Sequence, residues 1–101
     1  MKPADLLTIN PLLADRARLA IMANLSLADG PVEFNTLLEE LQLTKGNLSS
    51  HIRKLEEAGL VAVHKAFVDR KPRTTYMCTK EGKAEMRHYL STVEALLKAR
   101  K

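Results

Sequence analysis

The segment TKGNLSSHIRKLEEAGL, residues 44–60, constrains the fold more than any other stretch of this chain. Its apolar residues Leu48, Ile52 and Leu55 recur at steps of four and three, which predicts an amphipathic helix. An amphipathic helix buries its apolar face against other elements. The segment therefore predicts a globular domain in which this helix has one buried and one free face.

The free face of this helix begins with residues that form helices poorly: Gly46, Asn47, Ser49 and Ser50. Glycine inside a helix costs roughly 1 kcal/mol relative to alanine, and serine or asparagine about half that. A face that meets only water is usually filled with Glu, Lys and Gln, as the later Lys54, Glu56 and Glu57 illustrate. Small polar side chains permit a close approach by another molecule. The pattern therefore indicates a binding face.

The remaining elements follow from apolar spacing and from turn residues. Helices are predicted over 10–26, 33–43, 44–59 and 80–99, and the segment 60–79 is rich enough in β-branched and aromatic residues for two strands. The N-caps are Asn10, Thr44 and Thr79, and Gly59 is a left-handed residue that ends the third helix.

The two predicted strands are separated by the basic sequence DRKPR. Because proline cannot occupy a central strand, this sequence is expected to be a loop, and the strands form a hairpin with a basic tip. The order is helix, helix, helix, strand, basic loop, strand, helix. It predicts one α+β domain over 1–101, mainly α with a small β-hairpin: a winged helix-turn-helix with an N-terminal helix and a long C-terminal helix.

The net charge of +4 is concentrated in one part of the chain. Residues 44–73 hold seven bases and three acids, whereas the other 71 residues hold nine of each. Concentrated positive charge is an expected feature of a surface that binds a polyanion. A chance excess of charge on a solvated surface is the alternative.

Several classes of protein are disfavoured by what the sequence lacks. No apolar run reaches the ~18–20 residues of a membrane span, and the N-terminus does not resemble a secretory signal. The single cysteine, Cys78, fits a cytoplasmic protein and is expected to be a small core residue. No catalytic grouping or cofactor motif occurs, and His64 and His88 have no metal-ligand spacing, so we expect no enzyme, cofactor or metal.

Residues 34–61 (FNTLLEELQLTKGNLSSHIRKLEEAGLV) and the hairpin sequence KAFVDRKPRTTYMCTKEG resemble the winged-helix transcriptional regulators of the MarR/ArsR-like superfamily, in their compact single-domain branch. The resemblance runs from about Pro11 to the last helix. It implies a homodimer that binds double-stranded DNA at a pseudo-palindromic operator. Its recognition helix is 44–59 and its wing is 60–79.

The DNA-binding residues expected in the recognition helix are Thr44, Lys45, Gly46, Asn47, Ser49, Ser50, Arg53 and Lys54. The resemblance implies that Arg70, Lys71 and Arg73 of the wing reach the minor groove or its phosphates. The Asp-x-Arg pattern of many larger relatives is not reproduced, because Asp69 is followed directly by Arg70. It stays open which arginine enters the groove, and Arg70 is only narrowly favoured.

The helices over 10–26 and 80–99 are expected to form the dimer, because the last helix is apolar over a wider face than one core requires. The expected interface residues are Leu12, Leu13, Met86, Tyr89, Leu90, Val93, Leu96 and Leu97. A monomer whose last helix folds back on the domain is the alternative. A small apolar effector beside Tyr89, Met86 and Met22 is a further hypothesis.

Two other functions stay open. One is a winged helix that binds a protein partner, although such a surface would expose apolar anchors at the tip and recognition face. The other is an architectural protein that binds DNA without sequence preference. The operator, the target genes and the sign of regulation cannot be read from the sequence.

Overall fold

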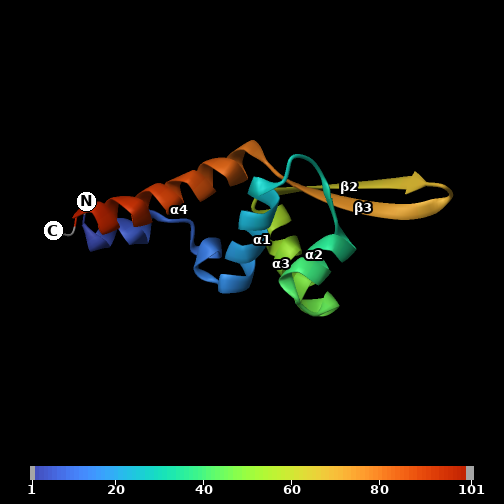
Figure 1. Ribbon diagram of the computed structural model, residues 1–101, viewed down its shortest axis with the longest axis horizontal. Coiled ribbons are helices and arrows are strands. Elements are labelled where there is room, and N and C mark those ends of the chain that lie inside the picture. The colour runs from blue at the N-terminus through green and yellow to red at the C-terminus, as the bar shows by residue number, and fades with distance from the viewer. Residues whose placement is uncertain (1, 100–101) are drawn as a thin grey trace.

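The computed structural model describes residues 2–99, and the molecule is long for its size. Its radius of gyration is 15.2 Å, where a compact chain of about 100 residues has about 13 Å, and it extends over 58 × 25 × 22 Å. Figure 1 shows the cause: the hairpin projects from one end of a helical centre, and the last helix projects from the other.

The fold is a mainly helical α+β domain, as the sequence predicts. Its elements are η1 (Pro3–Thr8), η2 (Pro11–Ala14), α1 (Arg16–Leu27), β1 (Val32–Glu33), α2 (Phe34–Leu41), α3 (Lys45–Glu57), β2 (Val61–Val68), β3 (Lys71–Cys78) and α4 (Lys80–Ala99), where η marks a 3-10 helix. The sheet is antiparallel with the order β1-β3-β2. Helices α1 to α3 pack beneath the base of the hairpin, and its tip extends beyond them (Figure 1).

The core lies where the three helices meet the base of the sheet. Leu48, Ile52 and Leu55 of α3 are all buried, which confirms the predicted apolar face of that helix. The other buried apolar side chains are Leu13, Ile21, Met22, Leu25, Leu37, Leu60, Val61, Tyr76, Cys78 and Met86. This core fixes α3 so that its opposite face stays free.

Both ends of α3 are formed as predicted. The Thr44 hydroxyl accepts a hydrogen bond of 3.1 Å from the backbone N–H of Asn47. At the other end, Gly59 has φ of 78°, and the N–H of Leu60 donates to the carbonyl of Leu55 at 2.9 Å. A left-handed glycine with this bond is a common way to end a helix.

The prediction of one helix over 10–26 is wrong. Asn10 does accept from the N–H of Leu12, but it caps only the short helix η2. Asp15 then interrupts the helix, because its carboxylate accepts from the N–H groups of Ala17 (2.8 Å) and Arg18 (3.0 Å). Asp is a strong N-cap residue, so it begins α1 as a new helix.

The loop predicted for DRKPR is shorter in the structure than in the prediction. The turn consists of Asp69 and Arg70 alone, with φ of 52° and 67°, and β3 already begins at Lys71. Pro72 lies opposite Phe67 inside the hairpin. Proline is tolerated there because β1 pairs with β3 only farther along, so the other edge of β3 has no partner strand among the described residues.

The last helix forms over the predicted range and leaves the core at a glycine. Thr79 caps α4 by accepting from the N–H of Gly82 at 2.9 Å. Gly82 is buried, and a Cβ there would lie only 2.2 Å from the backbone oxygen of Leu60. Glycine is therefore required where α4 crosses the start of β2, a constraint that the helical pattern did not reveal.

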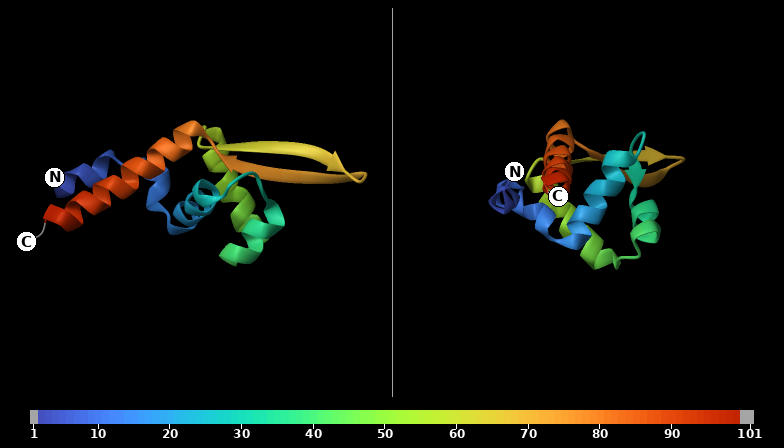
Figure 2. Two further views of the ribbon diagram at one scale, coloured as in Figure 1. Left: turned by 45° about the horizontal axis from the view of Figure 1, so that its top comes forward. Right: turned by 60° about the vertical axis from the view of Figure 1, so that its left-hand side comes forward.

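Beyond the core, α4 and η1 run side by side and form a projection (Figure 2), which we call the terminal arm, residues 3–9 and 87–99. The Thr8 hydroxyl and His88 Nε2 lie 2.8 Å apart and join the two helices. Asn10 Nδ2 donates to Glu85 Oε2 at 3.4 Å near the base of the arm. The terminal arm and the wing thus lie at opposite ends of the molecule.

Candidate nucleic-acid interface

The outward face of α3 is formed by the residues that the helical period places there. All eight residues expected to bind DNA from the recognition helix are exposed: Thr44, Lys45, Gly46, Asn47, Ser49, Ser50, Arg53 and Lys54. The ion pairs between described residues are Asp15–Arg18, Glu33–Arg73 and Glu94–Lys98, so Lys45, Arg53 and Lys54 are not engaged by acids of residues 2–99.

Gly46 has no internal reason to be glycine. Its φ is not positive, and a Cβ at this position would meet no atom within 4 Å beyond the adjoining residues and the backbone of its own helix. The fold of the protomer therefore tolerates alanine at position 46, which is also the better helix former. A requirement for glycine there has to come from a molecule outside the protomer.

The wing places its cations in two different settings. Arg70 lies in the turn and Lys71 directly follows it, and both are exposed. Arg73 Nε instead donates to Glu33 Oε1 of β1 at 2.8 Å. Arg70 and Lys71 therefore have no ion-pair partner among residues 2–99, whereas Arg73 is held by Glu33 of β1.

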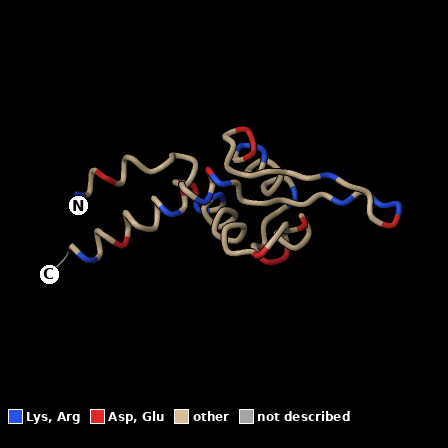
Figure 3. Tube along the Cα trace, turned by 90° about the horizontal axis from the view of Figure 1, so that it is seen from above, with Lys and Arg blue, Asp and Glu red and all other residues tan. Residues whose placement is uncertain are grey.

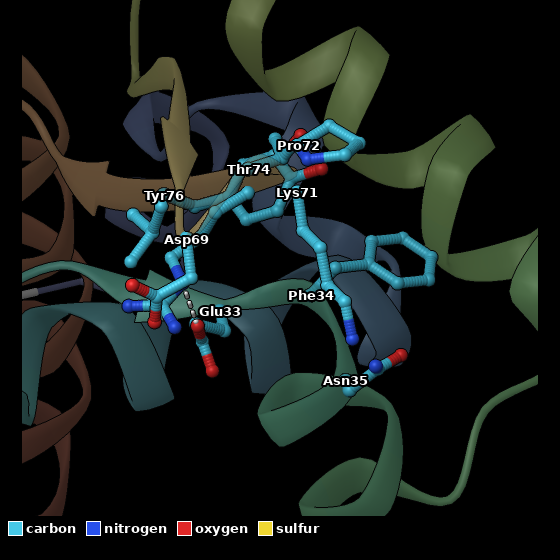
Figure 4. Close-up of a pocket in the computed structure, with 10 residues that line it drawn as sticks. Glu33, Phe34, Asn35, Asp69, Lys71, Pro72, Thr74 and Tyr76 are labelled. Atoms are coloured by element: carbon cyan, nitrogen blue, oxygen red, sulfur yellow. Dashed lines mark ion pairs between the residues drawn. The ribbon is translucent and has the colours of Figure 1, made fainter.

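The pair between Glu33 and Arg73 lies in a groove between the hairpin and the start of α2 (Figure 4). The groove has a volume of about 680 Å³ and is also lined by Asn35 and Lys71. In its floor the rings of Phe34 and Tyr76 lie 6.3 Å apart, tilted by 52°. These contacts join the wing to α2. These contacts were not predicted from the sequence, because the strand β1 is only two residues long.

A second contact that was not predicted from the sequence joins Arg18 of α1 to His51 of α3. Arg18 is mostly buried; its Nε donates to the carbonyl of Leu12 at 2.8 Å, and its Nη1 lies 3.3 Å from Nδ1 of His51. A guanidinium only donates, so Nδ1 of His51 is the acceptor. The backbone N–H of Arg18 also lowers the pKa of the Asp15 carboxyl. Arg18 thus ties η2 and α1 to the recognition helix.

The residues expected in a dimer interface fall into three groups. Leu13 and Met86 are only 1% and 4% exposed, so they belong to the core of the protomer and are corrected as interface residues. Leu12, Tyr89, Val93 and Leu96 are partly buried. Leu90 and Leu97 are 58% and 73% exposed, and η1 adds Leu7, which the sequence reasoning did not include and which is 87% exposed.

An apolar hollow of about 320 Å³ lies where the terminal arm meets the core. Its lining residues are Leu6, Leu7, Ile9, Asn10, Pro11, Ala14 and Tyr89. Tyr89 is thus placed as the effector hypothesis expects. Met22 and Met86 are not, because both are buried in the core.

Cys78 is a core residue, as predicted from its position in the strand. Its side chain is buried, and desolvation raises the pKa of its thiol. A raised pKa lowers the thiolate fraction at neutral pH, and the thiolate is the reactive form.

Three helices, a two-stranded wing and a free polar helix face define the class of winged-helix DNA-binding proteins. A family model described as winged helix DNA-binding domain matches residues 17–97, and the chain belongs to this family. Within residues 2–99, no helix is both long and apolar enough to cross a bilayer.

Solved structures and a curated protein resemble this chain. A transcriptional regulator homologue from Pyrococcus horikoshii is 38% identical, with 89% of this chain and 88% of that one covered and a TM-score of 0.81. A MarR-like transcriptional regulator from Thermotoga maritima is 30% identical, with 89% and 64% covered and a TM-score of 0.66. An uncharacterized protein of Methanocaldococcus jannaschii is 38% identical over 66 residues, 65% of this chain and 72% of that protein. The neighbours place the chain among compact winged-helix transcriptional regulators.

Proposed function

We propose that this protein is a sequence-specific transcriptional regulator that binds double-stranded DNA as a homodimer at a pseudo-palindromic operator. The observation that carries the proposal is the outward face of α3, which is small, polar and exposed although such residues weaken a helix. A cationic hairpin lies beside it, and Figure 3 shows the bases along both strands and at the tip.

The recognition helix enters the major groove in this proposal. Gly46 allows the start of α3 to approach the bases or a phosphate, and the N-terminus of a helix favours a phosphate. Asn47, Ser49 and Ser50 exchange hydrogen bonds with bases or phosphates, and Arg53 reaches a guanine edge or the backbone. In addition, Thr44, Lys45 and Lys54 contact the DNA at the edges of this helix face.

The wing binds the neighbouring minor groove or its phosphates. Arg70 is our choice for the arginine that enters the groove, because it lies in the turn and is exposed. Lys71 supplies phosphate contacts. Arg73, paired with Glu33, steadies the wing and makes at most a peripheral contact.

The homodimer forms through the terminal arm. Leu7, Leu90 and Leu97 are large apolar side chains left exposed at the end of the molecule remote from the wing. A second copy that covers them with Tyr89, Val93 and Leu96 would bury this surface and point two recognition helices at one duplex. Such pairs bind half-sites about one helical turn apart.

A small apolar effector is a secondary part of the proposal. The hollow beside Tyr89 is mostly apolar, and Pro11, which lines it, directly precedes Leu12, whose carbonyl accepts from Arg18. Arg18 in turn contacts His51 of α3. A ligand there would alter the connection between arm and recognition helix. Calorimetry across a panel of apolar metabolites tests this part, and an unchanged DNA affinity with all of them would remove it.

The experiment that tests the function is a selection from random duplex DNA at physiological salt, followed by sequencing of the retained molecules. An enriched inverted repeat with half-sites about one helical turn apart is the expected result. Retention without enrichment, lost steeply as salt rises, would favour an architectural DNA-binding protein. No retention would favour a winged helix that binds a protein. In each case we expect the protein to act in the cytoplasm.

A further inference from the structure

The wing carries a large apolar side chain that neither the fold nor the cationic contacts explain. Phe67, the second-last residue of β2, is 79% exposed. Its partner across the hairpin is Pro72, which is also exposed. Side chains of such directly opposed pairs have Cβ atoms about 4.5–5.5 Å apart, so the two rings form one apolar spot just behind the turn.

This spot faces the side of the sheet on which the recognition helix lies. Successive side chains of a strand alternate between faces, so Phe67 shares a face with Val61 and Val63. Val61 is buried and Val63 packs on the core, and β2 contacts α3. Phe67 lies on the same face, in the part of the hairpin next to the turn. The tip of the hairpin extends beyond the helices (Figure 1).

The charges around Phe67 identify the kind of surface that would cover it. Lys65 lies two residues earlier on the same face, and Arg70 and Lys71 follow in the turn and at the start of β3. Asp69 is the single acid between them. A partner therefore has to be anionic and also offer apolar surface. The minor groove of duplex DNA does both, because deoxyribose rings line it between two rows of phosphates.

We propose that Phe67 is an apolar DNA contact: the wing carries its ring into the minor groove beside Arg70, against the deoxyribose sugars and next to the phosphates that Lys71 binds. This rests on the proposed function, that α3 and the wing bind duplex DNA. Proteins that enter the minor groove commonly use apolar side chains there as wedges. The contact removes an exposed aromatic ring from water, so it adds affinity without adding charge.

The test compares Phe67→Ala and Phe67→Leu with the wild type on a duplex of about 30 base pairs that contains the selected site, or a random sequence if none is enriched. Affinity is measured over a series of salt concentrations. Phe67→Ala is expected to bind about tenfold more weakly per wing at every salt concentration. The slope of log affinity against log salt is unchanged, because no phosphate contact is lost. Phe67→Leu retains part of the affinity.

Hydroxyl-radical footprinting on the same duplex reads the contact directly, because these radicals attack the sugars. The wild type is expected to protect sugars beside each major-groove contact, and Phe67→Ala to lose that protection alone. The matched control is Leu27→Ala, which removes another exposed side chain (84%) at the end of α1, outside the hairpin. It should leave affinity and footprint unchanged.

Three results would overturn the proposal, and one of them would also overturn the proposed function. If the wild type binds DNA and Phe67→Ala matches it in affinity and sugar protection, the ring makes no contact. If Phe67→Ala flattens the salt dependence, the ring only positions the cations of the wing. If the wild type binds no duplex, both the contact and the DNA-binding function are wrong. Thermal unfolding of each variant confirms that the hairpin is still folded.

Discussion

The two ends of the molecule depart from an ordinary solvent surface in opposite ways. The recognition helix and wing expose small polar residues and an excess of bases, whereas the terminal arm exposes leucines, and its described charges are balanced between acids and bases. Short polar side chains and positive charge suit contact with a duplex, and apolar side chains suit contact with another protein. One small domain thus separates two kinds of exposed surface by distance along its long axis.

The largest expected effect comes from making the arm polar. The variant Leu90→Glu/Leu97→Glu should be monomeric, because two carboxylates would be buried without partners in the proposed interface. Loss of the second copy should weaken binding to a palindromic site by about 10²–10⁴-fold while half-site binding is retained. Sedimentation and DNA titration measure the two effects.

The control for the arm is Leu27→Glu, which adds one carboxylate, where the double variant adds two, at an exposed leucine outside the arm. It should change neither oligomeric state nor DNA affinity. If the double variant is still dimeric, another surface joins the protomers. The proposal that the terminal arm is the dimer interface would then be wrong.

The next largest effect is expected on the free energy of unfolding, from a substitution at Gly82, where α4 crosses the start of β2. Gly82→Ala should lower the free energy of unfolding by about 3 kcal/mol, at the upper end for overpacking, because its methyl group would meet the backbone of Leu60. Urea unfolding followed by circular dichroism measures the loss. Gly30→Ala, whose added Cβ would meet nothing within 4 Å, is the control. Equal stability of both variants would contradict a tight crossing of α4 over β2.

Local chemistry at element ends explains which parts of the fold the sequence predicts. Thr44, Gly59 and Thr79 each satisfy backbone groups within a few residues, so α3 and the start of α4 are predictable. Asn10 and Asp15 are competing caps, and the sequence alone does not say that the second interrupts the helix. The short strand β1 depends on pairing with distant residues, which no local pattern contains.

The sequence also predicts only the local part of the candidate site. The helical period identifies the outward residues of α3, and all of them are exposed. The period also marks Leu13 and Met86 as apolar, but it does not tell whether the protomer or a partner covers them. The contact of Arg73 with Glu33 joins residues far apart in the chain, so the different roles of the wing cations needed the structure.

Within the recognition helix, Arg53→Ala tests whether Arg53 contacts a base or a phosphate. If Arg53 makes a bidentate contact with a base, the variant should lose about 1–3 kcal/mol of discrimination between the selected site and a mutated one. Lys71→Ala is the contrasting variant. It should weaken all duplexes alike and reduce the salt slope by about one phosphate per subunit. Competition titrations over a salt series measure both, and equal weakening of every duplex by Arg53→Ala would assign Arg53 to the phosphates.

The smallest effect is expected from Gly46→Ala, and it separates stability from binding. Beyond the adjoining residues and the backbone of its own helix, no atom lies within 4 Å of the added Cβ, so the variant should be more stable by up to about 1 kcal/mol, the difference in helix propensity. The same methyl group should weaken DNA binding, because it lies where α3 approaches the duplex. Urea unfolding and DNA titration on one preparation measure both quantities. A variant that gains stability and binds DNA as the wild type does would show that the duplex does not come close to Gly46, and the weak helix formers on this face would then have another cause.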